Sequence, residues 1–337
     1  MIPKGIHNLG NTCFINACIQ ILLQTPELDY SIVEPELQKD IPENKIYNEW
    51  KLCKESLENP SISIISPISF IEAIHNIAQL KNQVLFSGFA QNDMPEFLLF
   101  FIDNLHIRLK CEIQYNIFGV QQNDTDKLAI QCYEMMKTKY EKDYSPLIDI
   151  FFGISISTIS SLDKYPLSSI SEPYFVLDLP IHGNNIYDCL DNYVSHELLD
   201  NENAWYNEKT QQKENVFKQI SFWNFPKIVV FTFKRFSSTI MREGIRLLKK
   251  MDFIDFPIDE LDLSNYICGY HASKYKYELY GICNHIGNVM GGHYTAFVKT
   301  KENQWFHCND TIIEKIENPQ QIVTSMAYAL FYRRLLS

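Results

Sequence analysis

The chain has 337 residues, of which 46% are hydrophobic, so it carries enough apolar material for one large domain or two ordinary ones. Its formal net charge is −11, with 30 Lys and Arg against 41 Asp and Glu, which argues against a nucleic-acid or anionic-membrane partner. The same acidity suits a basic protein partner, although many proteins carry such a charge for solubility alone.

The first part of the chain has the apolar spacing of helices. Residues 11–24 and 67–80 each place apolar side chains on one helical face. Residues 91–110 have the clearest start signal, because Asn92 or Asp93 can cap a helix and a proline falls in its first turn. Helices are therefore predicted at these three places.

From about residue 150 the pattern changes to short segments rich in aromatic and β-branched residues. A helical stretch around Asp188–Leu199 and a polar segment after it interrupt this pattern. Strands are predicted over residues 151–161, 173–181, 226–236, 275–285, 291–300, 303–310 and 326–336. Helices followed by an antiparallel sheet predict an α+β fold with segregated layers rather than βαβ repetition. No Gly/Ser-rich or Pro-rich linker divides the chain, so one folded unit with lobes is expected.

Nine cysteines are scattered along the chain without any CxxC pair, which predicts free thiols in a reducing, intracellular compartment, cytoplasmic or nuclear. Two of them, Cys13 and Cys18, lie in the segment HNLGNTCFINACIQ at residues 7–20. A turn-and-cap sequence, Gly10-Asn11-Thr12, precedes Cys13, so Cys13 falls at a helix start, where free N–H groups and the helix dipole lower the pKa of a thiol.

Cys18 lies about 140° further round the same helix, more than a turn from its end. It is therefore expected to pack as a small hydrophobe. From this segment alone, Cys13 could also be a buried structural cysteine.

His293 follows two glycines in GNVMGGHYTAFVK and stands at the start of a predicted strand. Glycines there let backbones approach closely and leave room for a substrate. The next predicted strand ends at Asn309 and Asp310, and a hairpin would bring His293 beside Asn309. A cysteine, a histidine base and a polar orienting residue form a thiol-protease constellation, although a single histidine is more often a packed or surface residue.

GIHNLGNTCFINACIQ, at residues 5–20, resembles the cysteine box of the ubiquitin-specific proteases. YELYGICNHIGNVMGGHYTAFVK followed by QWFHCNDTIIEKI resembles the histidine box of that family. Between them, GFAQNDMPEFLLFFIDNL is similar to the glutamine/aspartate motif, and FPKIVVFTFKRF is similar to the central strand that ends in an arginine and an aromatic residue. The four blocks occur in the family order and span residues 5 to about 334.

The resemblance implies a papain-like cysteine protease of the α+β class, shaped as a hand with a helical thumb, a β palm and β fingers. As a single catalytic domain of residues 1–337, it would have its thumb at about 1–145, its fingers at about 150–225 and its palm at about 226–337. The implied activity is thiol-dependent hydrolysis of the isopeptide or peptide bond after the C-terminal glycine of ubiquitin, through an acyl-enzyme.

Five positions match the catalytic residues of that family. The resemblance implies that Cys13 is the nucleophile and that His293 is the general base, which Asn309 orients. Asp310 is the neighbouring polar residue that some members also need. Asn8 matches the family's oxyanion donor, since a side-chain amide can donate to the developing O⁻; the alternative is a plain turn residue.

Four more positions match residues near the ubiquitin tail. Gln91 and Asp93 match positions that meet the tail, and a carboxylate at Asp93 suits the arginine in that tail. Asp93 can also be a plain helix cap. His285 matches a histidine near the tail cleft, and Tyr294 follows the catalytic histidine as in many members, but both can equally serve packing.

The chain departs from the family in its fingers. Many members hold a structural Zn²⁺ with two CxxC pairs, which would fall here near residues 161–164 and 207–210. Neither window contains a cysteine, so no metal or other cofactor is expected.

Two other interpretations remain open, a protease for another ubiquitin-like modifier and a non-catalytic ubiquitin-binding scaffold. The expected partners are ubiquitin and ubiquitinated proteins, with no nucleic acid and no membrane, and the expected state is a monomer.

Overall fold

The computed structural model describes residues 2–28, 41–241, 244–288 and 291–335. Its helices are α1 (Cys13–Leu23), α3 (Glu43–Glu58), α4 (Ile68–Leu80), α5 (Met94–Leu109), α6 (Asp124–Tyr140), α7 (Pro146–Phe151) and α8 (Ile186–Tyr193). Its strands are β1 (Gly5–Ile6), β2 (Ile64–Ile65), β3 (Gly153–Ser161), β4 (Pro166–Tyr174), β5 (Val176–Leu179), β6 (Glu197–Leu199), β7 (Trp205–Asn207), β8 (Gln212–Glu214), β9 (Val216–Asn224), β10 (Ile228–Phe233), β11 (Phe236–Met241), β12 (Gly244–Lys249), β13 (Leu261–Asp262), β14 (Lys276–Asn288), β15 (Gly291–Lys299), β16 (Trp305–Asn309), β17 (Ile312–Ile316) and β18 (Ala327–Arg334).

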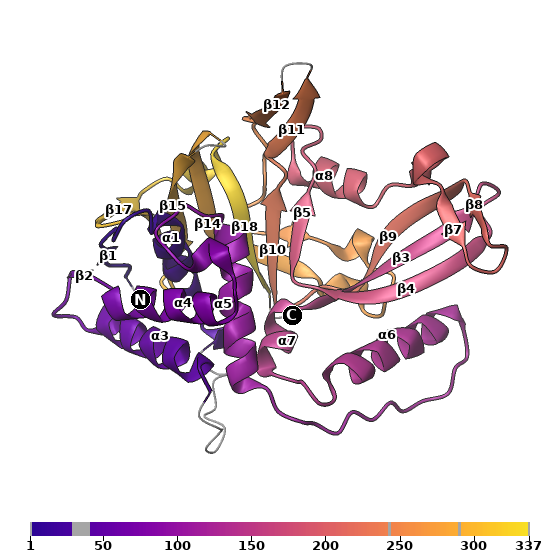
Figure 1. The fold of residues 1–337 in the computed structure, drawn as a ribbon, viewed down its shortest axis with the longest axis horizontal. Helices are drawn as coiled ribbons and strands as arrows, with labels where there is room; N and C mark the ends of the chain where they lie inside the picture. The colour runs from indigo at the N-terminus through magenta and orange to yellow at the C-terminus, as the bar shows by residue number, and fades with distance from the viewer. Residues whose placement is uncertain (1, 29–40, 242–243, 289–290, 336–337) are drawn as a thin grey trace.

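Helices and strands are segregated, as the sequence predicted. Figure 1 shows α1, α3, α4 and α5 gathered at the left of the view and the strands β3, β4 and β9 at the right, while the larger sheet runs from β17 at the upper left to β10 and β5 near the centre. Among the described residues, no helix combines the length and the apolar character needed to cross a membrane.

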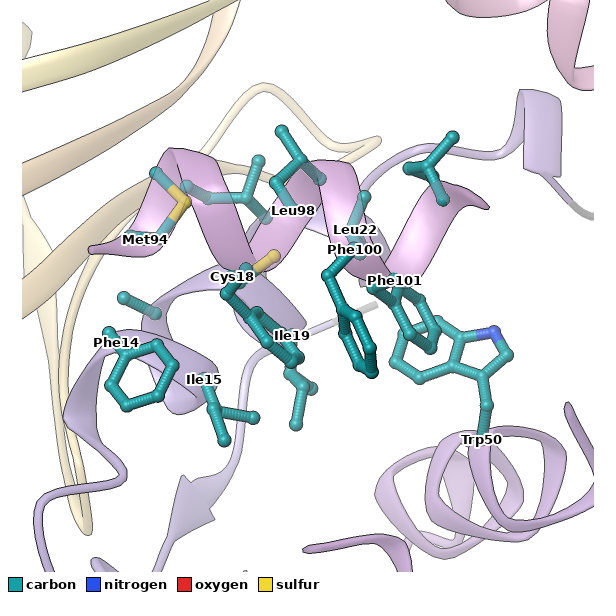
Figure 2. Close-up of a cluster of buried hydrophobic side chains, with 14 of the residues drawn as sticks. Phe14, Ile15, Cys18, Ile19, Leu22, Trp50, Met94, Leu98, Phe100 and Phe101 are labelled. Atoms are coloured by element: carbon teal, nitrogen blue, oxygen red, sulfur yellow. The ribbon is translucent and has the colours of Figure 1, made fainter. Parts of the chain in front are cut away.

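The helical lobe, or thumb, is held together by side chains that meet between α1, α3 and α5. Figure 2 shows Cys18 and Ile19 of α1 in one apolar cluster with Leu98 and Phe101 of α5 and Trp50 of α3. The rings of Trp50 and Phe101 meet edge to face, with centroids 5.3 Å apart.

The opposite side of α1 packs against β14, β15 and β16 of the large sheet. The approach is closest at Gly281, where an added Cβ atom would lie 2.8 Å from Ile21 Cγ2. A glycine is therefore required at this position. The contacts of α1 with the sheet place the helix, and Cys13 at its N-terminus, at the junction of thumb and palm.

The palm is an eight-stranded sheet in the order β17-β16-β15-β14-β18-β10-β5, with β13 beside β14. All of its pairs are antiparallel except β10 with β5, which is parallel. The prediction of an antiparallel sheet was therefore wrong at this one pair, since periodicity gives no information on strand direction.

The fingers are a second sheet in the order β4-β3-β9-β6, extended by the β7–β8 hairpin. The helix α6 packs against β4, where Gln131 Nε2 donates to the Ser169 carbonyl oxygen (3.1 Å). The expected boundary between fingers and palm, at residue 225, differs from the observed sheets at one strand. The strand β5 lies within the expected finger range but pairs with β10 in the palm.

The predicted helices at residues 11–24, 67–80 and 91–110 are confirmed as α1, α4 and α5. The stretch around Asp188–Leu199 is only partly helical, because α8 ends at Tyr193 and Glu197–Leu199 forms β6. The sequence analysis did not identify α3 and α6, which are rich in polar residues.

Candidate active site

Cys13 is the first residue of α1, directly after a turn in which Gly10 and Asn11 have φ values of 101° and 56°. The side chain is only 2% exposed. Burial raises the pKa of the Cys13 thiol, and the nearby Asp310 carboxylate adds to this, against the lowering by the backbone amides of Tyr294, Phe14 and Cys13 itself. The expectation that the helix start lowers this pKa was therefore wrong for the free protein, since desolvation outweighs the amide donors.

Cys18 is fully buried in the cluster between α1 and α5 (Figure 2). Burial alone strongly raises the pKa of its thiol. The prediction that Cys18 packs as a small hydrophobe is confirmed, and a buried thiol that stays protonated is unsuited to attack.

His293 lies on β15 and Asn309 is the last residue of the neighbouring β16. Asn309 Oδ1 accepts a hydrogen bond from His293 Nε2 at 2.7 Å, so the predicted hairpin contact is confirmed. This bond fixes the proton on Nε2 and leaves Nδ1 as the basic nitrogen of a neutral ring. The next residue, Tyr294, presents its backbone amide to the Cys13 thiol, so β15 passes directly beside the expected nucleophile.

Asp310 occupies the tight turn between β16 and β17 and has a φ of 50°, in the left-handed region. This conformation supplies the bend after Asn309 that two useful contacts from successive residues require. The Asp310 carboxylate accepts from Asn8 Nδ2 (3.1 Å) and from Asn16 Nδ2 (2.7 Å). Asp310 thus contacts the thumb, while Asn309 contacts the histidine.

Asn8 is exposed and its amide is oriented from both ends. Its Oδ1 accepts from the backbone N–H groups of Gly10 (3.1 Å) and Thr12 (3.1 Å), and its Nδ2 donates to Asp310. An amide nitrogen carries two protons, so one remains for another acceptor. The geometry is suited to the predicted oxyanion role, because Asn8 and Cys13 lie at the two ends of one short turn.

Asn16 is a member of this cluster that the sequence analysis missed. It lies one turn after Cys13 on α1, is 3% exposed and donates to Asp310. The available signal was an amide side chain in the mostly apolar run CFINACIQILL, since a buried amide needs a hydrogen-bond partner.

A cavity of about 290 Å³ lies between the start of α5 and the β14–β15 hairpin. Its lining includes all four residues expected near a ubiquitin tail, Gln91, Asp93, His285 and Tyr294. The cavity is therefore a candidate channel for an extended peptide, and it is called the tail channel below.

Gln91 joins the two walls of the tail channel. Its Oε1 accepts from the Gly292 backbone N–H (3.0 Å), and its Nε2 donates to the Gly292 carbonyl oxygen. Both ends of the amide are therefore used by the residue directly before His293. The contact positions the strand that carries the histidine, a role that the sequence analysis did not assign to Gln91.

Asp93 is the N-cap of α5, as predicted, because its Oδ1 accepts from the Glu96 backbone N–H at 3.2 Å. Its Oδ2 also accepts from the hydroxyls of Tyr328 (2.6 Å) and Tyr294 (3.5 Å). Burial raises the pKa of Asp93, against the lowering by the Tyr328 hydrogen bond. A guanidinium group in the channel would lower the pKa of Asp93 again.

His285 is 4% exposed and packs on Tyr294, with ring centroids 4.7 Å apart. Burial, then the charges of Lys249 and His293, lower the pKa of His285 to about 4. Burial strongly raises the pKa of Tyr294. Both side chains therefore pack the wall of the tail channel in their neutral forms.

The family resemblance implies a zinc site at the finger tip. In the second expected window, Asn207 Nδ2 (3.0 Å) and Thr210 Oγ1 (2.5 Å) both donate to Glu214 Oε1. These groups are hydrogen-bonded to one another and include no thiolate, so they do not fit a structural zinc site. Within the described part of the chain, no group of three or more His, Cys, Asp or Glu side chains is placed to hold a metal ion.

Comparison with known proteins gives a consistent match. The sequence pattern of the ubiquitin carboxyl-terminal hydrolase family matches residues 4–332. Ubiquitin carboxyl-terminal hydrolase 2 of Bos taurus is 30% identical and aligns with 97% of this chain and 54% of its own length. Ubiquitin carboxyl-terminal hydrolase 4 of Saccharomyces cerevisiae is 27% identical, over 98% of this chain and 39% of its own length. The chain thus spans about half or less of these relatives.

Solved structures also match over the whole fold. The structure of the SAGA Ubp8/Sgf11/Sus1/Sgf73 DUB module bound to ubiquitin aldehyde contains a chain that is 25% identical, with a TM-score of 0.73. That match covers 100% of this chain and 72% of the other. A second structure, of that module bound to monoubiquitin, gives a TM-score of 0.74 at 24% identity, with 100% and 72% of the two chains covered.

Proposed function

Because this chain belongs to the ubiquitin carboxyl-terminal hydrolase family, we propose that it hydrolyses the bond after the C-terminal glycine of ubiquitin with Cys13 as the nucleophile. One observation carries the proposal. The Cys13 thiol at the start of α1 interacts with the backbone amide of Tyr294, the residue after His293, and with the charge of Asp310, which holds Asn8, while Asn309 orients His293. A base with its orienting residue and an amide donor are the two parts that acyl transfer to a thiol needs.

In the first half of the reaction, His293 Nδ1 takes the proton of the Cys13 thiol as the sulfur attacks the glycine carbonyl carbon. The C–O double bond opens, and the free N–H of Asn8 donates to the resulting oxyanion. When the intermediate collapses, the C–N bond breaks and His293 gives its proton to the leaving amine. A thioester between Cys13 and ubiquitin remains.

In the second half, His293 accepts a proton from water, which attacks the thioester carbonyl. Collapse of the second intermediate breaks the C–S bond and releases the ubiquitin carboxyl group, which loses its proton to solvent, and His293 returns its own proton to the sulfur. Asn309 keeps the proton on Nε2 throughout, so Nδ1 always faces the reacting atoms.

The raised pKa of Cys13 determines at which step of the reaction the thiolate forms. Burial disfavours the thiolate of Cys13 in the free protein. Proton transfer then belongs to the attack itself, when the developing oxyanion and the imidazolium offset each other. The same burial protects the thiol from oxidation between turnovers.

We also propose that the ubiquitin tail lies in the tail channel and that Asp93 faces the arginine of that tail. The cavity volume and the buried carboxylate support this assignment. We propose further that the fingers need no zinc, since Asn207, Thr210 and Glu214 close the hairpin with hydrogen bonds.

The deciding experiment is incubation with ubiquitin that carries a C-terminal electrophile, followed by mass spectrometry of the protein and its peptides. One ubiquitin adduct, on Cys13, is expected. An adduct only with the electrophile of another ubiquitin-like modifier would establish the alternative substrate. Tight ubiquitin binding without any adduct would instead establish a non-catalytic scaffold.

A further inference from the structure

Lys249, the last residue of β12, contacts His285 in the wall of the tail channel. Its Nζ contacts three acceptors of β14: His285 Nδ1 (2.8 Å), the His285 carbonyl oxygen (2.7 Å) and the Gly287 carbonyl oxygen (3.2 Å). An ammonium group has three protons, so all of them are matched. In the described part of the chain β12 pairs with β11 alone, and β14 belongs to the palm, so this contact ties the β11–β12 hairpin to the large sheet.

The contact also decides the tautomer of His285. A lysine ammonium group can only donate, so His285 Nδ1 must accept and therefore carries no proton. The ring proton then resides on Nε2. The low pKa of His285, about 4, keeps the ring neutral at physiological pH, since burial, Lys249 and His293 all disfavour the imidazolium.

His285 lines the tail channel, and its Nε2 lies on the side of Gly292. Gly292 lines that cavity, and a Cβ atom added there would lie 2.3 Å from His285 Nε2. The Phe236 ring closes the same corner, 5.3 Å from the His285 ring and 5.9 Å from Lys249 Nζ. An extended peptide in the channel therefore meets an N–H donor at this point, and a backbone carbonyl is the acceptor that fits it.

The surroundings of Lys249 disfavour its charged form. Burial and the charge of Arg235 lower its pKa to about 8. The groups that face the Lys249–His285 pair are Arg235 of the strand connection, His293 and Tyr294 of β15 and Tyr328 of β18. Among the described residues no carboxylate forms an ion pair with Lys249, so its three directed hydrogen bonds are the contacts that hold the cation here.

We propose that Lys249 is a positioning residue for substrate, which holds His285 as a neutral Nε2–H donor to a backbone carbonyl of the peptide tail. This inference rests on the proposed function. It makes tail affinity depend on the docking of the β11–β12 hairpin, through one side chain that does not itself touch the reacting atoms.

The test compares Lys249→Met with Lys250→Met, a neighbouring and exposed lysine that loses the same charge. On a ubiquitin–fluorophore substrate, Lys249→Met should raise KM by about 10-fold, the upper end of the effect of losing one hydrogen bond between neutral groups, with kcat nearly unchanged. Lys250→Met should leave both constants within about twofold of the wild type. Equal KM values for the two variants would overturn the proposal.

A second measurement separates positioning from a general structural loss. In ¹⁵N-histidine spectra of the wild-type protein, His285 should show the Nε2–H tautomer. In Lys249→Met the Nδ1–H tautomer should appear, and the pKa of His285 should rise, with a new acid limb in kcat/KM. A wild-type His285 protonated on Nδ1 would refute the inference, even if the wild type hydrolysed no ubiquitin substrate and the proposed function failed.

A double variant completes the design. In a His285→Gln background, Lys249→Met should add no further rise in KM, because the histidine through which it acts is gone. A full additional 10-fold rise there would show that Lys249 acts on the tail by another route.

Discussion

Replacement of Asp310 by asparagine gives the sharpest test of how the oxyanion donor is held. The carboxylate accepts from Asn8 Nδ2 (3.1 Å) and from Asn16 Nδ2 (2.7 Å). An asparagine at position 310 tolerates the left-handed φ of 50°, but it offers one carbonyl oxygen and one NH₂ group. The shorter, buried bond to Asn16 takes the oxygen. The NH₂ group then faces the Asn8 NH₂ group, donor against donor.

Loss of this anchor should misplace the Asn8 amide. Complete removal of one oxyanion donor costs about 10²–10³ in kcat, or about 2.7–4 kcal/mol. Asn8 keeps the two hydrogen bonds that its Oδ1 accepts, so Asp310→Asn should lower kcat by about 10- to 100-fold with little change in KM. A second effect has the opposite sign. The Asp310 charge raises the pKa of Cys13, so its removal lowers that pKa, but only in part, since burial is the larger cause.

The two effects separate in two assays. Steady-state hydrolysis of a ubiquitin–fluorophore conjugate should show the fall in kcat, while alkylation of Cys13 by iodoacetamide should shift to lower pH or stay unchanged. Asp310→Gly, which keeps the turn and removes the side chain, should reproduce the fall in kcat. An unchanged kcat in Asp310→Asn, or alkylation that slows in proportion to kcat, would refute the reasoning.

Three further outcomes are expected. Cys13→Ala should abolish hydrolysis and retain ubiquitin binding, whereas Cys18→Ala should stay active with a modest loss of thermal stability; a dead but folded Cys18→Ala with an active Cys13→Ala would reverse the assignment. Asn309→Ala should strongly reduce kcat/KM and Asn309→Asp should be tolerated, because either oxygen can accept from the histidine Nε2–H; near-full activity in Asn309→Ala would remove its orienting role. Treatment with a chelator should leave activity and melting temperature unchanged, and inactivation by the chelator would contradict the proposed zinc-free fingers. Glu214→Ala should lower the melting temperature, since it removes the acceptor that Asn207 and Thr210 share at the finger tip.

Much of the site could be predicted because its signals are local or belong to one hairpin. The start of α1 at Cys13 follows from the turn before it, and the N-cap of α5 follows from Asp93. The contact of His293 with Asn309 follows from two neighbouring strands. In each case the residues that cooperate lie in one element or in adjacent ones, so periodicity and turn chemistry are sufficient.

Other features depended on surfaces that meet only in the folded chain. At Cys13, burial raises the pKa of the thiol and the backbone amides lower it. The outcome depends on how deeply α1 packs between α5 and β15, which the sequence does not show. The helix α6 was missed for a related reason. It buries only a narrow face on the finger sheet, so its sequence carries little apolar periodicity.

By itself, the sequence determined the α+β order of the elements, the residue types of the site and their assignment to a family. Only the tertiary structure decided their partners: Asp310 to Asn8 and Asn16, Gln91 to Gly292, and Lys249 to His285. These pairs join segments that lie far apart in the chain. A side-chain amide, carboxylate or ammonium group can satisfy many partners equally well, and the packing of thumb against palm selects one of them.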